Sequence, residues 1–165
     1  MKNKHKIAHM IAAHAYARCS TAKRAQVGCV IVKDDRIISI GYNGMPTGWD
    51  NCCENIVSLP HWADDVNDIP EEDRKLYVEY KSKPEVLHAE ANAIGKLASS
   101  SESGKDSIAF VTMAPCLDCA KLLYQSGITK VYYNKIYRNT NGLDFLNKCN
   151  IPTEQLDVEQ QNLSL

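Results

Sequence analysis

The sequence lacks any long run of basic residues, and its charges almost cancel. Its 19 lysine and arginine residues are balanced by 20 aspartate and glutamate residues, for a formal net charge of −1. Proteins that bind duplex or long single-stranded nucleic acid neutralise phosphates with clustered lysine and arginine. The charge balance therefore argues against nucleic acid as the main partner.

Long apolar runs are also missing, so the sequence predicts no membrane-spanning helix and no membrane partner. Residues 1–6 are basic, but the amphipathic stretch after them is interrupted by His9 and His14 and lacks the continuous core of a signal peptide. The cysteine count is odd, at 7, and two of these cysteines stand in a C-x-x-C motif, which favours reduced thiols over a disulfide framework. We therefore expect a cytoplasmic location, in the host cytoplasm if the source is viral.

Apolar periodicity predicts a single α/β domain over residues 1–165. The pattern is typical of helices over about 4–18, 88–98, 116–127 and 143–149, and of strands over 27–32, 36–40, 108–113 and 130–133. Asp34 and Asp35 can turn the first strand back into the second as a hairpin. Because helix and strand alternate in the second half, parallel pairing is expected there, which makes the sheet mixed.

Residues 49–87 are too long for an ordinary connection between a strand and a helix. They are acidic and contain Pro60, Pro70 and Pro84. We interpret this segment as a functional insertion, with a helical piece of its own around residues 71–80.

The motif that indicates chemistry is His88-Ala89-Glu90, followed by Pro115-Cys116-Leu117-Asp118-Cys119. Cys116 and Cys119 are three residues apart where a helix is expected to begin, so both sulfurs share one face. A helix N-terminus also favours the thiolate form that zinc requires. Because His88 begins another expected helix, the three zinc ligands should meet where two helix N-termini converge.

Three protein ligands leave one zinc position for water, and zinc lowers the pKa of that water to about 7. Glu90, a carboxylate beside the metal that is not a ligand, can carry the proton. The pattern H-x-E followed by P-C-x-x-C matches the signature of zinc nucleobase deaminases. It predicts hydrolytic deamination with one catalytic zinc ion per chain. The alternative is a structural zinc knuckle, or two unrelated cysteines near a core histidine.

With Gly41-Tyr42-Asn43-Gly44-Met45-Pro46 and the apolar strand before it, the chain resembles the deoxycytidylate (dCMP) deaminases of the cytidine deaminase-like superfamily. The resemblance spans roughly residues 5–150. It implies a three-layer α/β/α fold with a mixed five-stranded sheet and the conversion of dCMP to dUMP for thymidylate synthesis. It also implies a homohexamer that dCTP activates and dTTP inhibits, with Mg²⁺ accompanying a bound triphosphate.

The resemblance assigns roles to individual residues. It makes His88, Cys116 and Cys119 the zinc ligands and Glu90 the proton shuttle. Substrate contacts are implied for Asn43 on the deoxyribose hydroxyl, for Tyr137 stacked on the cytosine ring and for Ala89. From the residues alone, Asn43-Gly44 is equally well a turn, and Tyr137 is equally well a core or interface residue.

A monophosphate substrate requires a cation near its 5′ end. Lys23 and Arg24 lie between the first expected helix and strand, close to the Asn43 loop by topology, and Arg138 follows Tyr137. These three side chains are the candidates for binding the phosphate, although basic residues in a loop are often only solvated surface.

The effector site that the resemblance implies combines the G-Y-N-G segment with the helix after His88 and a neighbouring subunit. Its residues here are Gly41, Tyr42, Gly44, Asn92 and Lys96. Some relatives have a basic residue where this chain has Ser99, which leaves the regulation open.

Some relatives also hold a structural zinc. The candidates for it here are Cys19, Cys52, Cys53 and His61, but Cys19 lies further from the first strand than that pattern expects. Cysteines of this kind are also common core residues.

Two other functions compete with the deamination of a free nucleotide, either dCMP or another cytosine nucleotide. A polynucleotide base deaminase would need a basic and aromatic groove, which the near-neutral charge disfavours. A catalytically silent protein that keeps zinc for folding would have no use for Glu90.

Overall fold

The computed structural model describes residues 1–158, and its centre is a five-stranded sheet with the order β2-β1-β5-β6-β7. Strand β1 (Gly28–Lys33) pairs antiparallel with both β2 (Arg36–Tyr42) and β5 (Ser107–Met113). Strands β6 (Ile128–Lys135) and β7 (Thr153–Gln155) continue the sheet in parallel. The expected mixed sheet is confirmed; β7 was not predicted.

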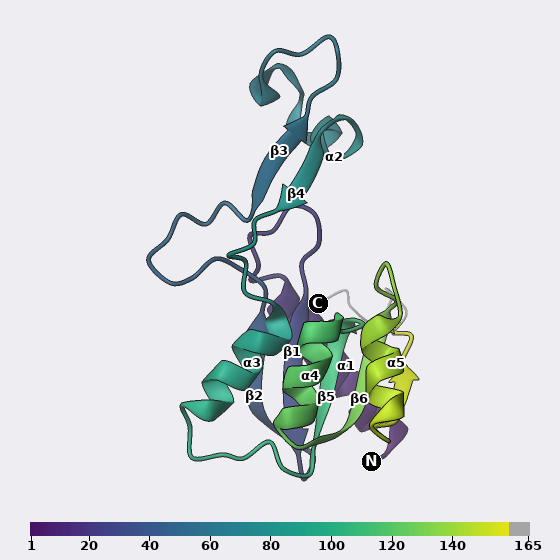
Figure 1. Ribbon diagram of the computed structural model, residues 1–165. Coiled ribbons are helices and arrows are strands. Elements are labelled where there is room, and N and C mark those ends of the chain that lie inside the picture. Colours follow the sequence, from purple (N-terminus) through teal and green to yellow (C-terminus); the bar gives the residue numbers. More distant parts are fainter. Residues whose placement is uncertain (159–165) are drawn as a thin grey trace.

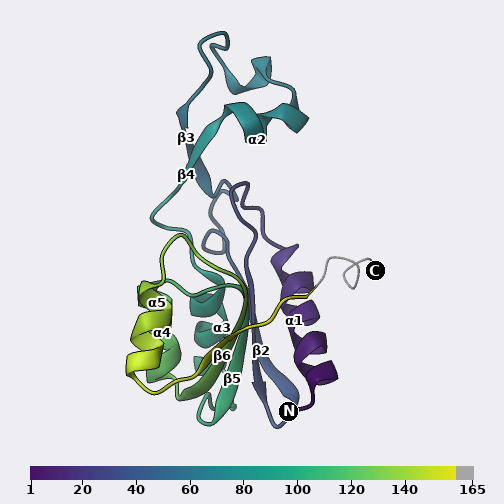
Figure 2. The same ribbon diagram turned by 90° about the vertical axis from the view of Figure 1, so that its right-hand side faces the viewer.

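Helices cover both faces of this sheet, as Figure 2 shows. Helix α1 (Asn3–Ala17) lies on one face. Helices α3 (Ala89–Ala98), α4 (Leu117–Gln125) and α5 (Asn141–Lys148) cover the other face (Figure 1). This is the predicted three-layer α/β/α architecture. None of the helices within residues 1–158 is long and apolar enough to cross a membrane.

Alternate residues of β1 face opposite layers of the core. Cys29 and Ile31 belong to the apolar cluster under α3, α4 and α5, whereas Val30 and Val32 belong to the cluster under α1. All four side chains are buried. The continuous apolar run in the sequence therefore reflects a strand covered on both faces.

The turn between β1 and β2 is tied to helix α1. Asp34 and Asp35 have φ values of 50° and 62°, the left-handed conformation that a tight two-residue hairpin requires. The Asp35 carboxylate forms hydrogen bonds with His5 and His9 of α1. The predicted hairpin is confirmed, and the turn holds the helix against the sheet.

Residues 49–87 form an arm that projects from the sandwich (Figure 1). Strands β3 (Glu54–Ser58) and β4 (Glu79–Ser82) pair antiparallel at its base. Two 3-10 turns, Val66–Asp68 and Glu71–Asp73, and the short helix α2 (Arg74–Tyr77) complete it. Buried residues of its small core are Ala63, Ile69 and Val78.

The helical piece predicted around residues 71–80 is confirmed over 71–77, but its end is wrong, because residues 79–82 form strand β4. The acidic and basic residues of this segment suit a helix, but Tyr80 finds a backbone partner in Ile56 of β3. Pairing with a strand that is distant in sequence thus overrides the local helix propensity.

Candidate active site

Two helix N-termini meet at the predicted metal site. His88 is the residue directly before α3, Cys116 is the residue directly before α4, and Cys119 lies in the first turn of α4. Gly142 at the start of α5 allows close packing there, because a Cβ atom at that position would overlap the Pro115 carbonyl oxygen. The expected convergence of the two helices is therefore present.

The three ligand atoms have the spacing of a zinc site. The Nδ1 atom of His88 lies 3.6 Å from the Cys116 sulfur and 3.4 Å from the Cys119 sulfur. Tetrahedral zinc with ordinary Zn–N and Zn–S bonds places such atoms about 3.5 Å apart. Within residues 1–158, this is the one group of three histidine, cysteine or acidic side chains close enough to hold a metal ion. The donors present therefore fit zinc.

The two sulfurs share a proton unequally. A hydrogen bond from Cys119, reinforced by one from His88, lowers the pKa of Cys116 to about 4. The same bond to Cys116, together with burial, raises the pKa of Cys119. Of the two thiols, Cys116 therefore loses its proton more readily, and metal binding would release the protons that remain.

Glu90 lies in the first turn of α3 beside these ligands and is only 4% exposed. Burial is the main cause that raises the pKa of its carboxyl group, because a charged carboxylate is poorly solvated there. A carboxyl group with a raised pKa gives up and regains a proton near neutral pH more readily than an exposed glutamate. Both the position of Glu90 and the raised pKa of its carboxyl group suit a proton shuttle.

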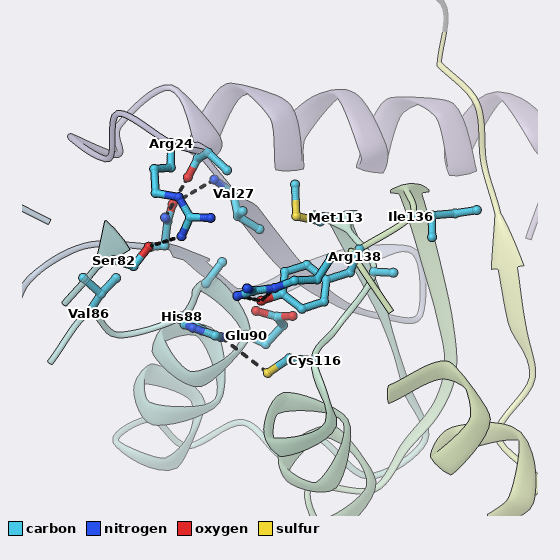
Figure 3. Close-up of a pocket in the computed structure, with 15 residues that line it drawn as sticks. Arg24, Val27, Ser82, Val86, His88, Glu90, Met113, Cys116, Ile136 and Arg138 are labelled. Atoms are coloured by element: carbon cyan, nitrogen blue, oxygen red, sulfur yellow. Dashed lines mark hydrogen bonds between the residues drawn. The ribbon is translucent and has the colours of Figure 1, made fainter. Parts of the chain in front are cut away.

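A cavity of about 330 Å³ opens directly onto Glu90 and the metal site. Figure 3 shows His88, Glu90 and Cys116 together at one end, with Arg24 and Ser82 at the other. The volume lies in the range of sites that hold small molecules, about 300–1,000 Å³. Other residues that line the cavity include Ala25, Val27, Asn43, Ala89, Tyr137 and Arg138.

The arm holds Arg24 in this cavity. The guanidinium donates a hydrogen bond from Nη1 to the Ser82 hydroxyl of β4 at 3.1 Å. The carboxylate of Glu54 in β3, only 6% exposed, accepts hydrogen bonds from the backbone N–H groups of Lys23 and Arg24 at 3.0 and 3.2 Å. Sequence analysis missed Glu54 and Ser82, because no local pattern links residues 30 and 58 positions away from Arg24.

Two other predicted substrate residues, Tyr137 and Arg138, also line the cavity, in the loop after β6. The Arg138 guanidinium donates to the Tyr137 hydroxyl from Nε at 3.0 Å and from Nη2 at 2.7 Å. The pair therefore presents an aromatic ring and a positive charge as one unit.

Asn43 both ties a loop and lines the cavity. Its amide donates to the Ala25 carbonyl at 2.9 Å, and its side-chain oxygen accepts from the Val27 N–H at 2.8 Å. Each polar end retains capacity for one more hydrogen bond. Asn43 directly follows β2 and Gly44 pairs with Leu87 in an isolated bridge, so residues 43–44 do not form the alternative turn. The contact of Asn43 with substrate stays a prediction.

Lys23, the remaining phosphate candidate, does not line this cavity. Its ammonium group lies 5.5 Å from the centre of the Tyr80 ring, in a separate hollow under the arm. Lys23 therefore lies outside the cavity that Arg24 and Arg138 line, although it precedes Arg24 directly in the chain.

The predicted effector residues gather between the end of β2 and helix α3. Asn92 donates to the Tyr42 carbonyl at 2.8 Å, and the Lys96 ammonium lies 5.5 Å from the centre of the Tyr42 ring. Gly44 exchanges two backbone hydrogen bonds with Leu87. Gly41 is required for packing, because a Cβ there would overlap the Ala89 carbonyl oxygen. The geometry links this surface to the metal helix.

The candidates for a second zinc are not brought together. The thiol of Cys52 donates to the Glu54 carbonyl, and that of Cys53 lies 3.5 Å from the Thr21 hydroxyl. No metal-ligating group of three within residues 1–158 includes Cys19, Cys52, Cys53 or His61. Cys19, which lies further from the first strand in sequence than the zinc pattern expects, is exposed in the structure.

Comparisons with known proteins agree with this geometry. The cytidine and deoxycytidylate deaminase zinc-binding region matches residues 1–135. The chain is 37% identical over 160 residues to deoxycytidylate deaminase of Enterobacteria phage T4, covering 84% of this chain and 82% of the phage protein. It is 34% identical over 125 residues to the human deoxycytidylate deaminase, covering 75% of this chain and 61% of the human protein.

Among solved structures, the dCMP deaminase of cyanophage S-TIM5 in complex with dCMP and dUMP superposes with a TM-score of 0.77. Its sequence is 37% identical, and the match covers 94% of this chain and 99% of that one. On sequence and structure alike, the chain belongs to the cytidine and deoxycytidylate deaminase family of hydrolytic enzymes.

Proposed function

We propose that this enzyme hydrolyses dCMP to dUMP and ammonia, with one zinc ion held by His88, Cys116 and Cys119. The observation that carries the proposal is the single cavity that joins these ligands and Glu90 to the cations Arg24 and Arg138. Such a cavity suits a substrate with a reactive base at one end and a phosphate at the other. The complex of the S-TIM5 relative with dCMP and dUMP supports the same substrate.

Zinc, when bound, makes water nucleophilic at neutral pH. Glu90 takes a proton from the attacking water and delivers it to the ring nitrogen next to C4 of cytosine. Glu90 then takes the proton of the new C4 hydroxyl and gives it to the amino group. The C4–N bond breaks, ammonia leaves, and the C4 oxygen becomes the carbonyl of dUMP. The burial of Glu90 supports both transfers, because a raised pKa lets one carboxyl group act first as base and then as acid.

The rest of the cavity positions the nucleotide. Arg24 and Arg138 bind the 5′-phosphate, Tyr137 stacks on the cytosine ring, and the free hydrogen-bonding capacity of Asn43 meets the deoxyribose hydroxyl. Ala89 forms part of the wall beside the base, where its small, fully buried side chain leaves room for the ring. Phosphate recognition therefore depends on Arg24, whose guanidinium the arm holds.

A direct assay tests this proposal. The purified protein is incubated with cytidine, deoxycytidine, dCMP, dCTP and a deoxycytidine oligomer, and ammonia and the uracil product are measured. We expect dCMP to react with by far the highest kcat/KM. Preference for the oligomer would favour a polynucleotide deaminase, and no reaction with any substrate would favour a protein that keeps zinc only for folding.

The product dUMP supplies thymidylate synthesis, and we propose that the cytoplasmic enzyme is a homohexamer that dCTP activates and dTTP inhibits. The effector, with Mg²⁺ on its triphosphate, binds at Gly41, Tyr42, Gly44, Asn92 and Lys96. The contacts of Asn92 and Lys96 with Tyr42 support this proposal, because they join the effector surface to the helix that carries Glu90.

Replacing Lys96 tests the regulatory site. Wild-type kinetics with dCMP should be sigmoidal, become hyperbolic with dCTP and become more sigmoidal with dTTP. Lys96→Ala should weaken both responses and leave the rate at saturating dCMP close to that of the wild type. Hyperbolic wild-type kinetics without a response to either triphosphate would remove the regulatory proposal and leave the catalytic one intact.

A further inference from the structure

A second hollow, of about 430 Å³, lies between the loop after α1 and the underside of the arm. Figure 2 shows α2 above this loop. The hollow adjoins the catalytic cavity, and Arg24 and Ala25 line both. The loop contributes Thr21, Ala22, Lys23, Arg24, Ala25 and Gln26, and the arm contributes Glu71, Arg74, Lys75 and Tyr80.

The lining of this hollow is strongly cationic. Lys23, Arg24, Arg74 and Lys75 line it, against the single carboxylate of Glu71. The arm around it is acidic, yet within residues 1–158 none of these four cations forms an ion pair with a carboxylate. Four unpaired cations in one concave site repel one another, and a polyanion would relieve this repulsion.

Parts of this lining are held in place. The Arg74 guanidinium is oriented by hydrogen bonds from Nε to the Ile69 carbonyl at 3.0 Å and from Nη2 to the Asn67 side chain at 3.4 Å. The ammonium group of Lys23 lies over the Tyr80 ring. The loop itself is fixed by Glu54, through the backbone N–H groups of Lys23 and Arg24. A ligand would therefore meet cations that are partly ordered before it binds.

The lining also indicates which chemistry the site recognises. Tyr80 is the one aromatic residue in it, and the Lys23 ammonium group lies over its ring, so the lining offers far more cationic than aromatic surface. Arginine and lysine donors suit phosphate oxygens. We infer that this hollow is a binding site for a polyphosphate group. It is distinct from the effector surface at Tyr42 and Lys96, and it lies next to the site proposed for the substrate phosphate, with which it shares Arg24.

Binding of inorganic tripolyphosphate tests the inference without reference to deamination. Isothermal titration calorimetry with the full-length protein should show saturable binding that weakens with salt. The double variant Lys23→Ala/Lys75→Ala should bind at least roughly tenfold more weakly, because each lysine offers a charge-assisted contact. Both side chains are exposed, so we expect the double variant to fold, with an unchanged far-UV circular dichroism spectrum.

Two control variants locate the site. Lys81→Ala removes one positive charge from β4, next to Tyr80 but outside the hollow, and Lys96→Ala removes one from the effector surface. Lys81→Ala should bind tripolyphosphate within about twofold of the wild type, since long-range charge effects are screened by salt. The weakening caused by the double variant should persist in the Lys96→Ala background, where the proposed effector site is suppressed. Absence of saturable binding, or weakening by Lys96→Ala and not by the double variant, would overturn the inference.

A parallel titration with dTTP identifies the source of the polyphosphate. It is done in the Lys96→Ala background, to suppress the proposed effector site. If the Lys23→Ala/Lys75→Ala changes lower the affinity for dTTP as much as the affinity for tripolyphosphate, the hollow binds the triphosphate of a nucleotide. If these changes lower the affinity for tripolyphosphate alone, the hollow binds free polyphosphate. Either result supports the site, and neither depends on whether dCMP is the substrate.

Discussion

The sandwich and the arm use different means to hold their shape. The sandwich buries two large apolar clusters, one on each face of its sheet. The arm has a small cluster centred on Ala63, Ile69 and Val78, while Leu76 and Trp62 are 75% and 52% exposed. The metal site requires fixed ligand geometry and lies in the sandwich, whereas the phosphate recognition that we propose lies where the arm meets the sandwich.

The two regions should therefore affect different steps of the reaction. Changes at the metal site should abolish turnover or the metal itself, because they alter groups that act on the reacting atoms. Changes at the base of the arm should mainly alter the affinity for the phosphorylated substrate. Four variants, taken from the largest expected effect to the smallest, test this division.

Glu90→Gln should retain zinc and the fold but lower kcat for dCMP by several orders of magnitude. The three metal ligands are untouched, while both proton transfers lose their carrier. Steady-state kinetics together with metal analysis measure the effect. Near-normal turnover at unchanged zinc content would show that another group moves the proton.

Cys116→Ala should lose bound zinc and lower the melting temperature by several degrees. The metal joins the N-termini of α3 and α4, so its binding free energy contributes to folding. Thermal unfolding and zinc content measure both effects, and treatment of the wild type with a chelator should reproduce them. Cys29→Ala is the control for zinc content. It should keep the metal, because Cys29 is buried in the sheet and is not in the metal group. Equal zinc content in Cys116→Ala and the wild type would exclude Cys116 as a ligand.

Arg24→Ala should raise KM for dCMP roughly tenfold to a hundredfold, the effect of one charge-assisted contact. The slow reaction with deoxycytidine should change little, because that substrate has no phosphate. Arg138→Ala should behave similarly, and Lys81→Ala, on the arm outside the cavity, is the matched control. If Arg24→Ala and Arg138→Ala still discriminate dCMP from deoxycytidine as the wild type does, the phosphate site lies elsewhere.

Glu54→Ala should raise KM for dCMP by a smaller factor, with kcat close to that of the wild type. Glu54 contacts the backbone of Lys23 and Arg24 and so acts only by positioning the guanidinium. Glu54→Gln should restore most of the affinity, because its amide oxygen still accepts these two hydrogen bonds. Equal KM for dCMP in Glu54→Ala and the wild type would mean that Arg24 keeps its place without the arm.

Much of the sandwich was predictable because its elements are locally encoded. The apolar run of β1 and the Asp34-Asp35 turn each depend on neighbouring residues. The arm was not predictable in this way. Strand β4 exists because β3 pairs with it, and short β7 exists because β6 lies beside it. Neither strand has a strong periodic pattern of its own.

By itself, the sequence determined the layered fold, because apolar periodicity is a local property of the chain. It also predicted the metal ligands and the acid beside them, from the spacing of His88, Glu90, Cys116 and Cys119. Only the tertiary structure decided which cations share the catalytic cavity. Lys23 and Arg24 are adjacent in sequence, but Ser82 and Glu54 of the arm hold Arg24 at the cavity while Lys23 lies over Tyr80. The physical reason is that hydrogen bonds between residues far apart in the chain, which no local pattern encodes, set the direction of each side chain in this loop.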